Sequence, residues 1–238
     1  MNRAGLTAED ELVMLLARPH RSEVEEARCR SLLLEEISWP AVVTRATAHG
    51  VLPVLARNLE GSGFAGVPTP VVAELWASYR VNAAHNVMLA DELRRVLGVL
   101  GQARVPVIPL KGVALAESLY GDTALRVCSD LDILVPRSMV RPALEVLRTM
   151  DYQVEFGEFI DLQLRHDIEC GLVRSNGVTH ALDLHWGIAW GGSKDEAAAD
   201  KLWSDAYPTC FQGVSAFGLS PEWAVLFMAL HAARHRWQ

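Results

Sequence analysis

Apolar residues in the first hundred positions recur at intervals of three and four between polar stretches. This is the period of helices that bury one face. Two segments carry the capping-box spacing that marks a helix start, at Thr7 with Asp10 and at Ser22 with Glu25. Thr69-Pro70 fits the first turn of a longer helix. The pattern predicts that residues 1–104 form a helical N-terminal region.

The period changes at residue 105, where short β-branched runs begin to alternate with helical segments. Strands are predicted at 105–110, 130–135 and 152–156, and helices at 111–120 and 138–150, the second capped by Ser138. Asn176-Gly177 is a strong turn signal between two more apolar runs, so 168–186 is predicted to be a β-hairpin. Residues 105–190 therefore read as a small mixed β-sheet with flanking helices.

The last segment, 191–238, is predicted to end in a helix. Ser220 is its expected cap and Pro221 its first residue. Its expected apolar face consists of Trp223, Leu226, Phe227 and Leu230. No stop signal precedes Gln238, which predicts further sequence after it. The fold class that follows is α+β: a helical N-terminal region, a small mixed-sheet core and a C-terminal helix.

The polar positions of the strand at 130–135 carry candidate chemistry. Side chains alternate along a strand, so Asp130 and Asp132 share one face about 6–7 Å apart. Leu131, Ile133 and Val135 would then face the core. Two carboxylates at that distance raise each other's pKa unless a cation lies between them. Mg²⁺ prefers such oxygen ligands and bridges carboxylates to phosphates.

A third carboxylate follows on the expected hairpin. Asp183 and His185 alternate with apolar residues there and share one face. A buried carboxylate without a partner is rarely tolerated, so Asp183 is the candidate that completes a two-metal site. His185 is a possible substrate or supporting residue, although a structural histidine explains the pattern equally well.

Residues near the carboxylates are suited to bind a triphosphate. Lys111-Gly112 is expected where a strand turns into a helix, so backbone N–H groups and an ammonium could approach phosphates there. Arg126 and Ser129 flank the carboxylates and add donors. Each of these residues also fits a solvated surface role, because neither Lys-Gly nor Asp-x-Asp is specific by itself.

The order of these motifs resembles a known family. LKGVALA, RVCSDLDILV and LDLHW follow one another as in the nucleotidyltransferase superfamily with the polymerase-β-like fold. The similarity is closest to the bacterial group catalogued as uncharacterised nucleotidyltransferases, and it covers residues 105–190. It implies that Asp130, Asp132 and Asp183 bind metal and that Gly112 belongs to the phosphate loop. Val113 departs from the superfamily, because a serine that contacts the triphosphate stands there in most members.

The resemblance implies Mg²⁺-dependent transfer of an NMP from an NTP to an acceptor hydroxyl, with release of pyrophosphate. The acceptor could be a small molecule, a peptide or protein side chain, or an RNA end. Two alternatives stay open: a nucleotide-binding or regulatory module with a decayed site, and a metal-dependent phosphotransferase or hydrolase. Val113 lends weight to the decayed module.

Composition narrows the partners further. The formal net charge is −7 and no basic block occurs, which argues against general DNA binding. No apolar run approaches the length of a membrane span. Neither a signal peptide nor a paired-cysteine pattern is visible, so a cytoplasmic location is expected.

Overall fold

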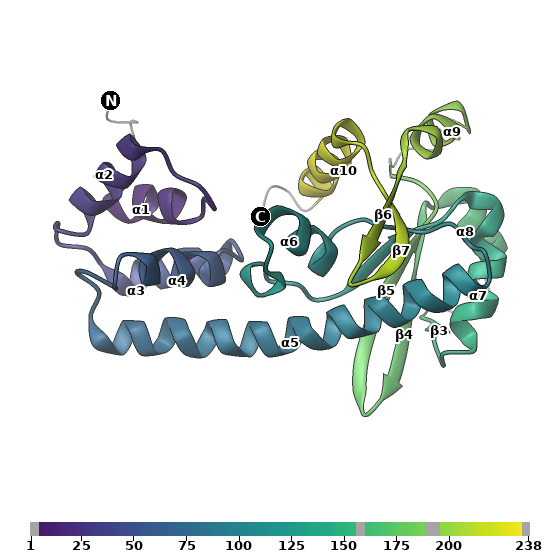
Figure 1. Cartoon of the computed structure of the whole chain (residues 1–238), viewed down its shortest axis with the longest axis horizontal. Helices are drawn as coiled ribbons and strands as arrows, with labels where there is room; N and C mark the ends of the chain where they lie inside the picture. Colours follow the sequence, from purple (N-terminus) through teal and green to yellow (C-terminus); the bar gives the residue numbers. More distant parts are fainter. Residues whose placement is uncertain (1–4, 156–159, 189–195, 235–238) are drawn as a thin grey trace. The chain divides into compact units, whose positions relative to one another are not determined.

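The computed structural model describes residues 5–155, 160–188 and 196–234. It confirms the predicted α+β class: helices precede and flank a mixed sheet, and the described chain ends in a helix (Figure 1). Two compact units can be distinguished, Met1–Val87 with Ala116–Cys128 and Met88–Leu115 with Ser129–Gln238. The predicted boundaries at residues 104 and 190 divide the chain by function and not by compactness, and they stay a prediction.

The first unit is helical. It contains α1 (Ala8–Leu16), α2 (Glu23–Leu32), α3 (Trp39–Ala48), α4 (Leu52–Gly61), the start of α5 (Thr69–Gln102) and the 3₁₀ turn η1 (Thr123–Leu125). Both predicted capping boxes are formed, at the starts of α1 and α2. The helices share one core, whose fully buried members include Leu12, Leu32, Val42, Leu55 and Leu75.

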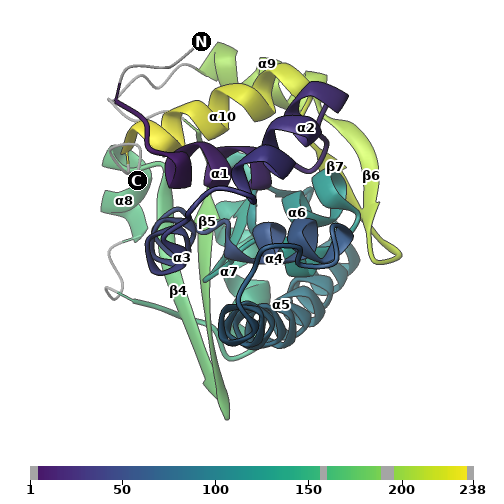
Figure 2. The ribbon, with the colours of Figure 1, turned by 90° about the vertical axis from the view of Figure 1, so that its left-hand side faces the viewer.

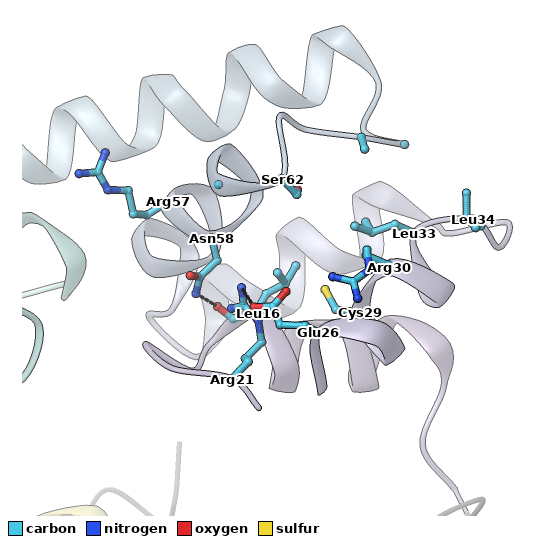
Figure 3. A pocket seen from close by; sticks show the side chains of 13 residues that line it. Leu16, Arg21, Glu26, Cys29, Arg30, Leu33, Leu34, Arg57, Asn58 and Ser62 are labelled. Atoms are coloured by element: carbon cyan, nitrogen blue, oxygen red, sulfur yellow. Dashed lines mark hydrogen bonds and ion pairs between the residues drawn. The ribbon is translucent and has the colours of Figure 1, made fainter. Parts of the chain in front are cut away.

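A cavity of about 560 Å³ lies in this helical unit (Figure 3). It is lined by parts of α2 and α4 and by the turn that follows each of them. Gly66 forms part of its wall with φ of +77°, and a β-carbon there would lie 2.5 Å from the carbonyl oxygen of Leu33. The wall therefore depends on a residue without a side chain.

Two asparagines of α5 hold the segment around η1. Asn82 Nδ2 donates to the carbonyl oxygens of Ala124 and Arg126 at 2.8 and 3.1 Å. One turn later, Asn86 Nδ2 donates to those of Thr123 and Arg126 at 2.6 and 2.7 Å. Asn86 is fully buried. These bonds satisfy carbonyls that a short 3₁₀ turn leaves without partners.

The second unit is built on a five-stranded mixed sheet. Its strands are β1 (Ile108–Pro109), β2 (Leu131–Leu134), β3 (Gln153–Val154), β4 (Glu169–Asn176) and β5 (Val178–His185). The spatial order is β1-β2-β5-β4-β3, with β2 and β5 parallel and the other neighbours antiparallel. Figures 1 and 2 show the long β4–β5 hairpin reaching beyond the other strands. That hairpin confirms the turn predicted at Asn176-Gly177.

Helices and a second hairpin complete this unit. They are the end of α5, the start of α6 (Gly112–Tyr120), η2 (Arg137–Met139), α7 (Val140–Arg148), α8 (Ile160–His166), α9 (Glu196–Asp205), β6 (Tyr207–Phe211), β7 (Val214–Gly218) and α10 (Pro221–Arg234). The backbone N–H of Phe217 donates to the Val107 carbonyl, which joins β7 to the chain entering β1. No helix within the described ranges combines the length and apolar character of a membrane crossing.

Three local predictions were wrong. Ser138 does not cap α7: it lies inside η2, and Met139 precedes the helix without a side-chain cap. The predicted strand at 105–110 is reduced to Ile108–Pro109, and Pro106, which cannot donate to a ladder, lies outside it. Leu226 of the expected apolar face is 43% exposed. The predicted continuation of α10 to Gln238 lies beyond residue 234, outside the described residues.

A buried ionic network ties α5 to the sheet. Glu92 is 2% exposed, and its Oε1 accepts from Tyr152 Oη at 2.9 Å and from Arg174 Nη1 at 2.6 Å. Its Oε2 accepts from Arg95 at 3.1 Å. Burial and the neighbouring carboxylate raise the pKa of Tyr152, so its hydroxyl keeps the proton that it donates. Each buried charge in this network has a partner.

Candidate active site

The parallel pairing of β2 with β5 brings the predicted carboxylates together. Asp132 lies opposite Asp183, and Leu134 lies opposite His185. Directly paired residues project to the same face of a sheet, so two acidic side chains from separate parts of the sequence become neighbours. Asp132 is 3% exposed and Asp183 is half-buried. Ionised carboxylates are not placed there without an electrostatic reason.

Lys111 provides one counter-charge. Its Nζ lies 3.5 Å from Asp130 Oδ2 and 3.0 Å from Asp132 Oδ2, so the ammonium bridges the two carboxylates of the Asp-x-Asp motif. Burial alone would lower the pKa of Lys111, but Asp132 and Asp130 outweigh it, and the pKa lies above its ordinary value. Lys111 is therefore a firmly charged partner of these carboxylates.

Backbone geometry explains why Lys111 reaches them. The N–H of Leu110 donates to the Asp132 carbonyl at 3.0 Å, which fixes the end of β1 beside β2. Gly112 follows with φ of +65° and starts α6; a β-carbon there would lie 3.3 Å from the Asp130 carbonyl oxygen. The predicted strand-to-helix turn is confirmed, and glycine suits it for both reasons. Ser129 Oγ donates to Asp130 Oδ1 at 3.1 Å.

His185 contacts carboxylates through both ring nitrogens. Nε2 lies 3.1 Å from Asp132 Oδ1, and Nδ1 lies 3.0 Å from Glu169 Oε2. Burial would raise the pKa of Asp132, but the hydrogen bond from His185 and the charge of Lys111 lower it overall. Glu169 carries no motif or periodic signal in the sequence that would mark it as a site residue. The ladder places it directly opposite His185 on β4.

Asp183 is a carboxylate whose negative charge is disfavoured by its surroundings, as expected where a cation would bind. Burial and the charge of Asp132 raise its pKa from 3.8 to about 6. One ligand atom each from Asp132, Asp183 and His185 lie within 4.8 Å of one another. Ligand atoms about 2.0–2.2 Å from one small divalent ion are at most ~4.4 Å apart, so a slight closure of the side chains suffices. These three residues fit a divalent metal.

The remaining predicted residues are placed differently. Arg126 belongs to the first unit, where its carbonyl oxygen accepts from Asn82 and Asn86. Val113 is 1% exposed, so the side chain at the position of the missing serine points into the protein interior. The structure thus gathers Lys111, Gly112, Ser129 and the acidic residues in the second unit. A phosphate-binding role for any of them stays a prediction.

The molecule is thus an α+β protein whose carboxylates gather on adjacent strands of a mixed sheet, where they could hold a divalent cation. The family model described as an uncharacterised nucleotidyltransferase matches residues 35–238. The chain belongs to this nucleotidyltransferase family. No curated protein and no solved structure matches it.

Proposed function

We propose that the chain is a Mg²⁺-dependent nucleotidyltransferase of the polymerase-β-like superfamily. It would move an NMP from an NTP to an acceptor hydroxyl and release pyrophosphate. The observation that supports this most is the pairing of Asp132 with Asp183 on adjacent parallel strands, in a chain of this family. Asp130, Asp132 and Asp183 are the proposed ligands of a two-ion site.

The proposed reaction is an in-line displacement. The acceptor oxygen forms a bond to the α-phosphorus, the bond from that phosphorus to the bridging β-phosphate oxygen breaks, and pyrophosphate leaves with the electron pair. Asp183 is the proposed acceptor of the hydroxyl proton. Bound Mg²⁺ would neutralise phosphate charge and acidify the attacking hydroxyl.

The chain's other residues would position the triphosphate. Lys111 has its charge beside Asp130 and Asp132, where it would meet the β- and γ-phosphates. Gly112 opens α6, so backbone N–H groups at that helix start are available to phosphate oxygens. Ser129 is proposed as a further donor to the triphosphate. Most of the rate would come from positioning and charge stabilisation.

Nucleotide binding can be tested by thermal shift with each of the four NTPs, with and without Mg²⁺. Ligand at 100 times its Kd adds about 2.7 kcal/mol of stability. For a chain of this size that corresponds to a rise in Tm of roughly 5–10 °C. The rise should require Mg²⁺ and should disappear in Asp130→Asn/Asp132→Asn. No rise with any NTP would contradict the proposed function.

Transfer is tested with an α-labelled NTP and Asp132→Asn, once a labelled acceptor has been found. Loss of the buried carboxylate should reduce label transfer by at least about 10³-fold, because metal and phosphate charge would no longer be held there. Asp91→Asn is the matched control: Asp91 pairs with Arg94 on the surface of α5. Full activity of a folded Asp132→Asn protein would overturn the assignment.

One observation favours a second candidate, a nucleotide-binding module that does not catalyse transfer. The buried Val113 supplies no hydroxyl to a triphosphate at the position where the superfamily has serine. A Mg²⁺-dependent shift with an NTP, without transfer to any acceptor, would support this module. Release of ADP or phosphate in place of pyrophosphate would indicate a phosphotransferase or hydrolase.

A further inference from the structure

His185 is a buried histidine with a carboxylate beside each of its ring nitrogens, which a purely structural role does not require. The side chain is 5% exposed, and each ring nitrogen lies about one hydrogen-bond length from a different carboxylate. The Phe227 ring lies beside it in a T-shaped arrangement, with centroids 6.3 Å apart and planes at 87°. The imidazole is therefore held in one orientation, with Nε2 toward Asp132 and Nδ1 toward Glu169.

The two nitrogens do not have equal neighbours. Glu169 Oε2 lies 3.0 Å from Nδ1 without hydrogen-bond geometry, and a small rotation of either side chain would let this carboxylate accept a hydrogen carried on Nδ1. Nε2, which is hydrogen-bonded to Asp132 Oδ1 at 3.1 Å, faces the side where Asp132 and Asp183 gather, and it would present a lone pair to a cation bound there once that hydrogen is released. A histidine whose far nitrogen contacts a carboxylate, with its near nitrogen directed at further ligand oxygens, is the common arrangement of histidines that bind metals.

Strand register produces this arrangement without any local motif. Residue 132 pairs with 183 across β2 and β5, and 169 pairs with 185 across β5 and β4. All four side chains therefore lie on one face. Gly171 is opposite Asp183, and the position that a β-carbon would take there lies 2.6 Å from Glu155 Oε2 and 3.7 Å from Asp183 Oδ1, so the Glu155 carboxylate occupies this space beside Asp183.

We propose that His185 binds the divalent cation through Nε2 together with Asp132 and Asp183, that Glu169 is the positioning residue for its ring, and that this position prefers first-row transition ions such as Mn²⁺ to Mg²⁺. Mg²⁺ selects oxygen ligands and near-ideal octahedra, whereas imidazole suits transition ions. The inference rests on the proposed function only in that the site holds a divalent cation. An all-oxygen position beside Asp130 would remain suited to Mg²⁺.

Coordination can be detected directly on the full chain without nucleotide. Pulsed EPR of the Mn²⁺-loaded protein should show ¹⁴N modulation from a bound imidazole. His185→Gln should lose this signal, and His180→Gln should keep it, because residue 180 lies on the same strand outside the cluster. Mn²⁺ that binds without ¹⁴N modulation in the wild type would overturn the proposal. The wild-type signal decides even if His185→Gln does not fold.

Selectivity separates a ligand from a merely structural residue. In Mn²⁺ titrations with Mg²⁺ as competitor, His185→Gln should weaken Mn²⁺ binding at least about tenfold, with little change for Mg²⁺. Glu169→Gln should weaken Mn²⁺ binding about 10- to 100-fold, as expected when the partner of a metal-bound histidine is lost. Variants that lower the Tm but keep the Mn²⁺-to-Mg²⁺ affinity ratio would overturn the proposal, as would a wild-type chain that binds no Mn²⁺.

These readouts are independent of the proposed activity. Nitrogen-coordinated Mn²⁺ in a chain that neither binds nor transfers any nucleotide would overturn the function and leave the coordination standing. NMP transfer by a protein whose Mn²⁺ shows no ¹⁴N modulation would overturn the coordination and leave the function standing.

Discussion

Asp183 combines a functional position with a cost in stability. Its pKa is raised from 3.8 to about 6, so the folded protein binds this proton more tightly than the unfolded chain. Its contribution to stability is therefore largest below about pH 4, falls as the pH rises to about 6, and stays low above that. The shift corresponds to about 3 kcal/mol, which solvent around the half-buried side chain reduces to about 1–2 kcal/mol.

Asp183→Asn is expected to be more stable than the wild type at pH 7.5 in chelator, and about equal to it at pH 4. Urea unfolding at both pH values measures the difference. Asp91→Asn serves as control, because Arg94 stabilises the charged form of Asp91 and no gain is expected. A loss of stability in Asp183→Asn at pH 7.5 would contradict this account of the carboxylate.

Substitution of Gly66 tests whether the wall of the cavity in the helical unit requires a residue without a side chain. Gly66→Ala combines a left-handed backbone with a β-carbon 2.5 Å from the Leu33 carbonyl oxygen, whereas Gly63→Ala meets only the backbone cost. Chemical denaturation should show a loss of about 1 kcal/mol for Gly63→Ala and at least ~1–2 kcal/mol more for Gly66→Ala. Equal losses would mean that the close approach to Leu33 carries no energy.

At the residue scale, the sequence identified side chains whose chemistry is visible in isolation. Asp132, Asp183 and the caps Thr7 and Ser22 are of this kind. The position of Glu169 opposite His185 could not be predicted, because it depends on a shift of one residue in the pairing of β4 with β5. A two-residue turn at 176–177 would pair 175 with 178, and residue 168 with 185; the ladder instead pairs 176 with 178, and so 169 with 185.

The elements are joined by buried charge as well as by apolar packing. Glu92→Leu would leave the buried Arg174 guanidinium without its carboxylate, so we expect a loss of about 3–5 kcal/mol in urea unfolding. Tyr152→Phe removes one hydrogen bond and should cost about 1 kcal/mol.

The double variant Glu92→Leu/Arg174→Met provides the control for that prediction. It removes both charges, so it should be more stable than Glu92→Leu alone. Glu92→Leu and Arg174→Met are also measured singly. A double variant whose loss equals the sum of these two losses would show that the ion pair contributes no coupling between α5 and β4.

Elements with a clear period were predictable, and those without one were not. The hairpin and α6 carry strong local patterns. In β6, only Phe211 is buried, so no alternation is visible. The start of α9 is a run of alanines without an apolar stripe. Tertiary contacts, such as those of Leu202 with its apolar neighbours, define that helix.

At the scale of the whole molecule, the net charge of −7 disfavours the binding of polyanions such as DNA wherever no specific site exists. Fluorescence anisotropy with a labelled DNA duplex at 50 mM salt should show no binding, because too few cations are available to displace the counterions of DNA. Submicromolar binding that weakens steeply with salt would contradict this. A Mg²⁺-NTP complex should bind under the same conditions.

Family membership was evident from the order of three short motifs, whereas the division into compact units was not. The matched region begins at residue 35, yet Leu12 and Leu32 before it are buried in the same core as Val42 and Leu55. Residues 116–128 also return to the first unit. Such long-range grouping follows from which surfaces pack, and no local period encodes it.

The parallel ladder between β2 and β5 has a consequence for how the protein matures. The proposed cation ligands come from residues about fifty positions apart, and a slip of one residue would turn Asp183 and His185 to the opposite face. A partly folded or misregistered chain therefore cannot chelate the ion well. Chelation energy would accrue only to the correctly assembled sheet, so the ion proposed to serve the reaction would also favour correct folding.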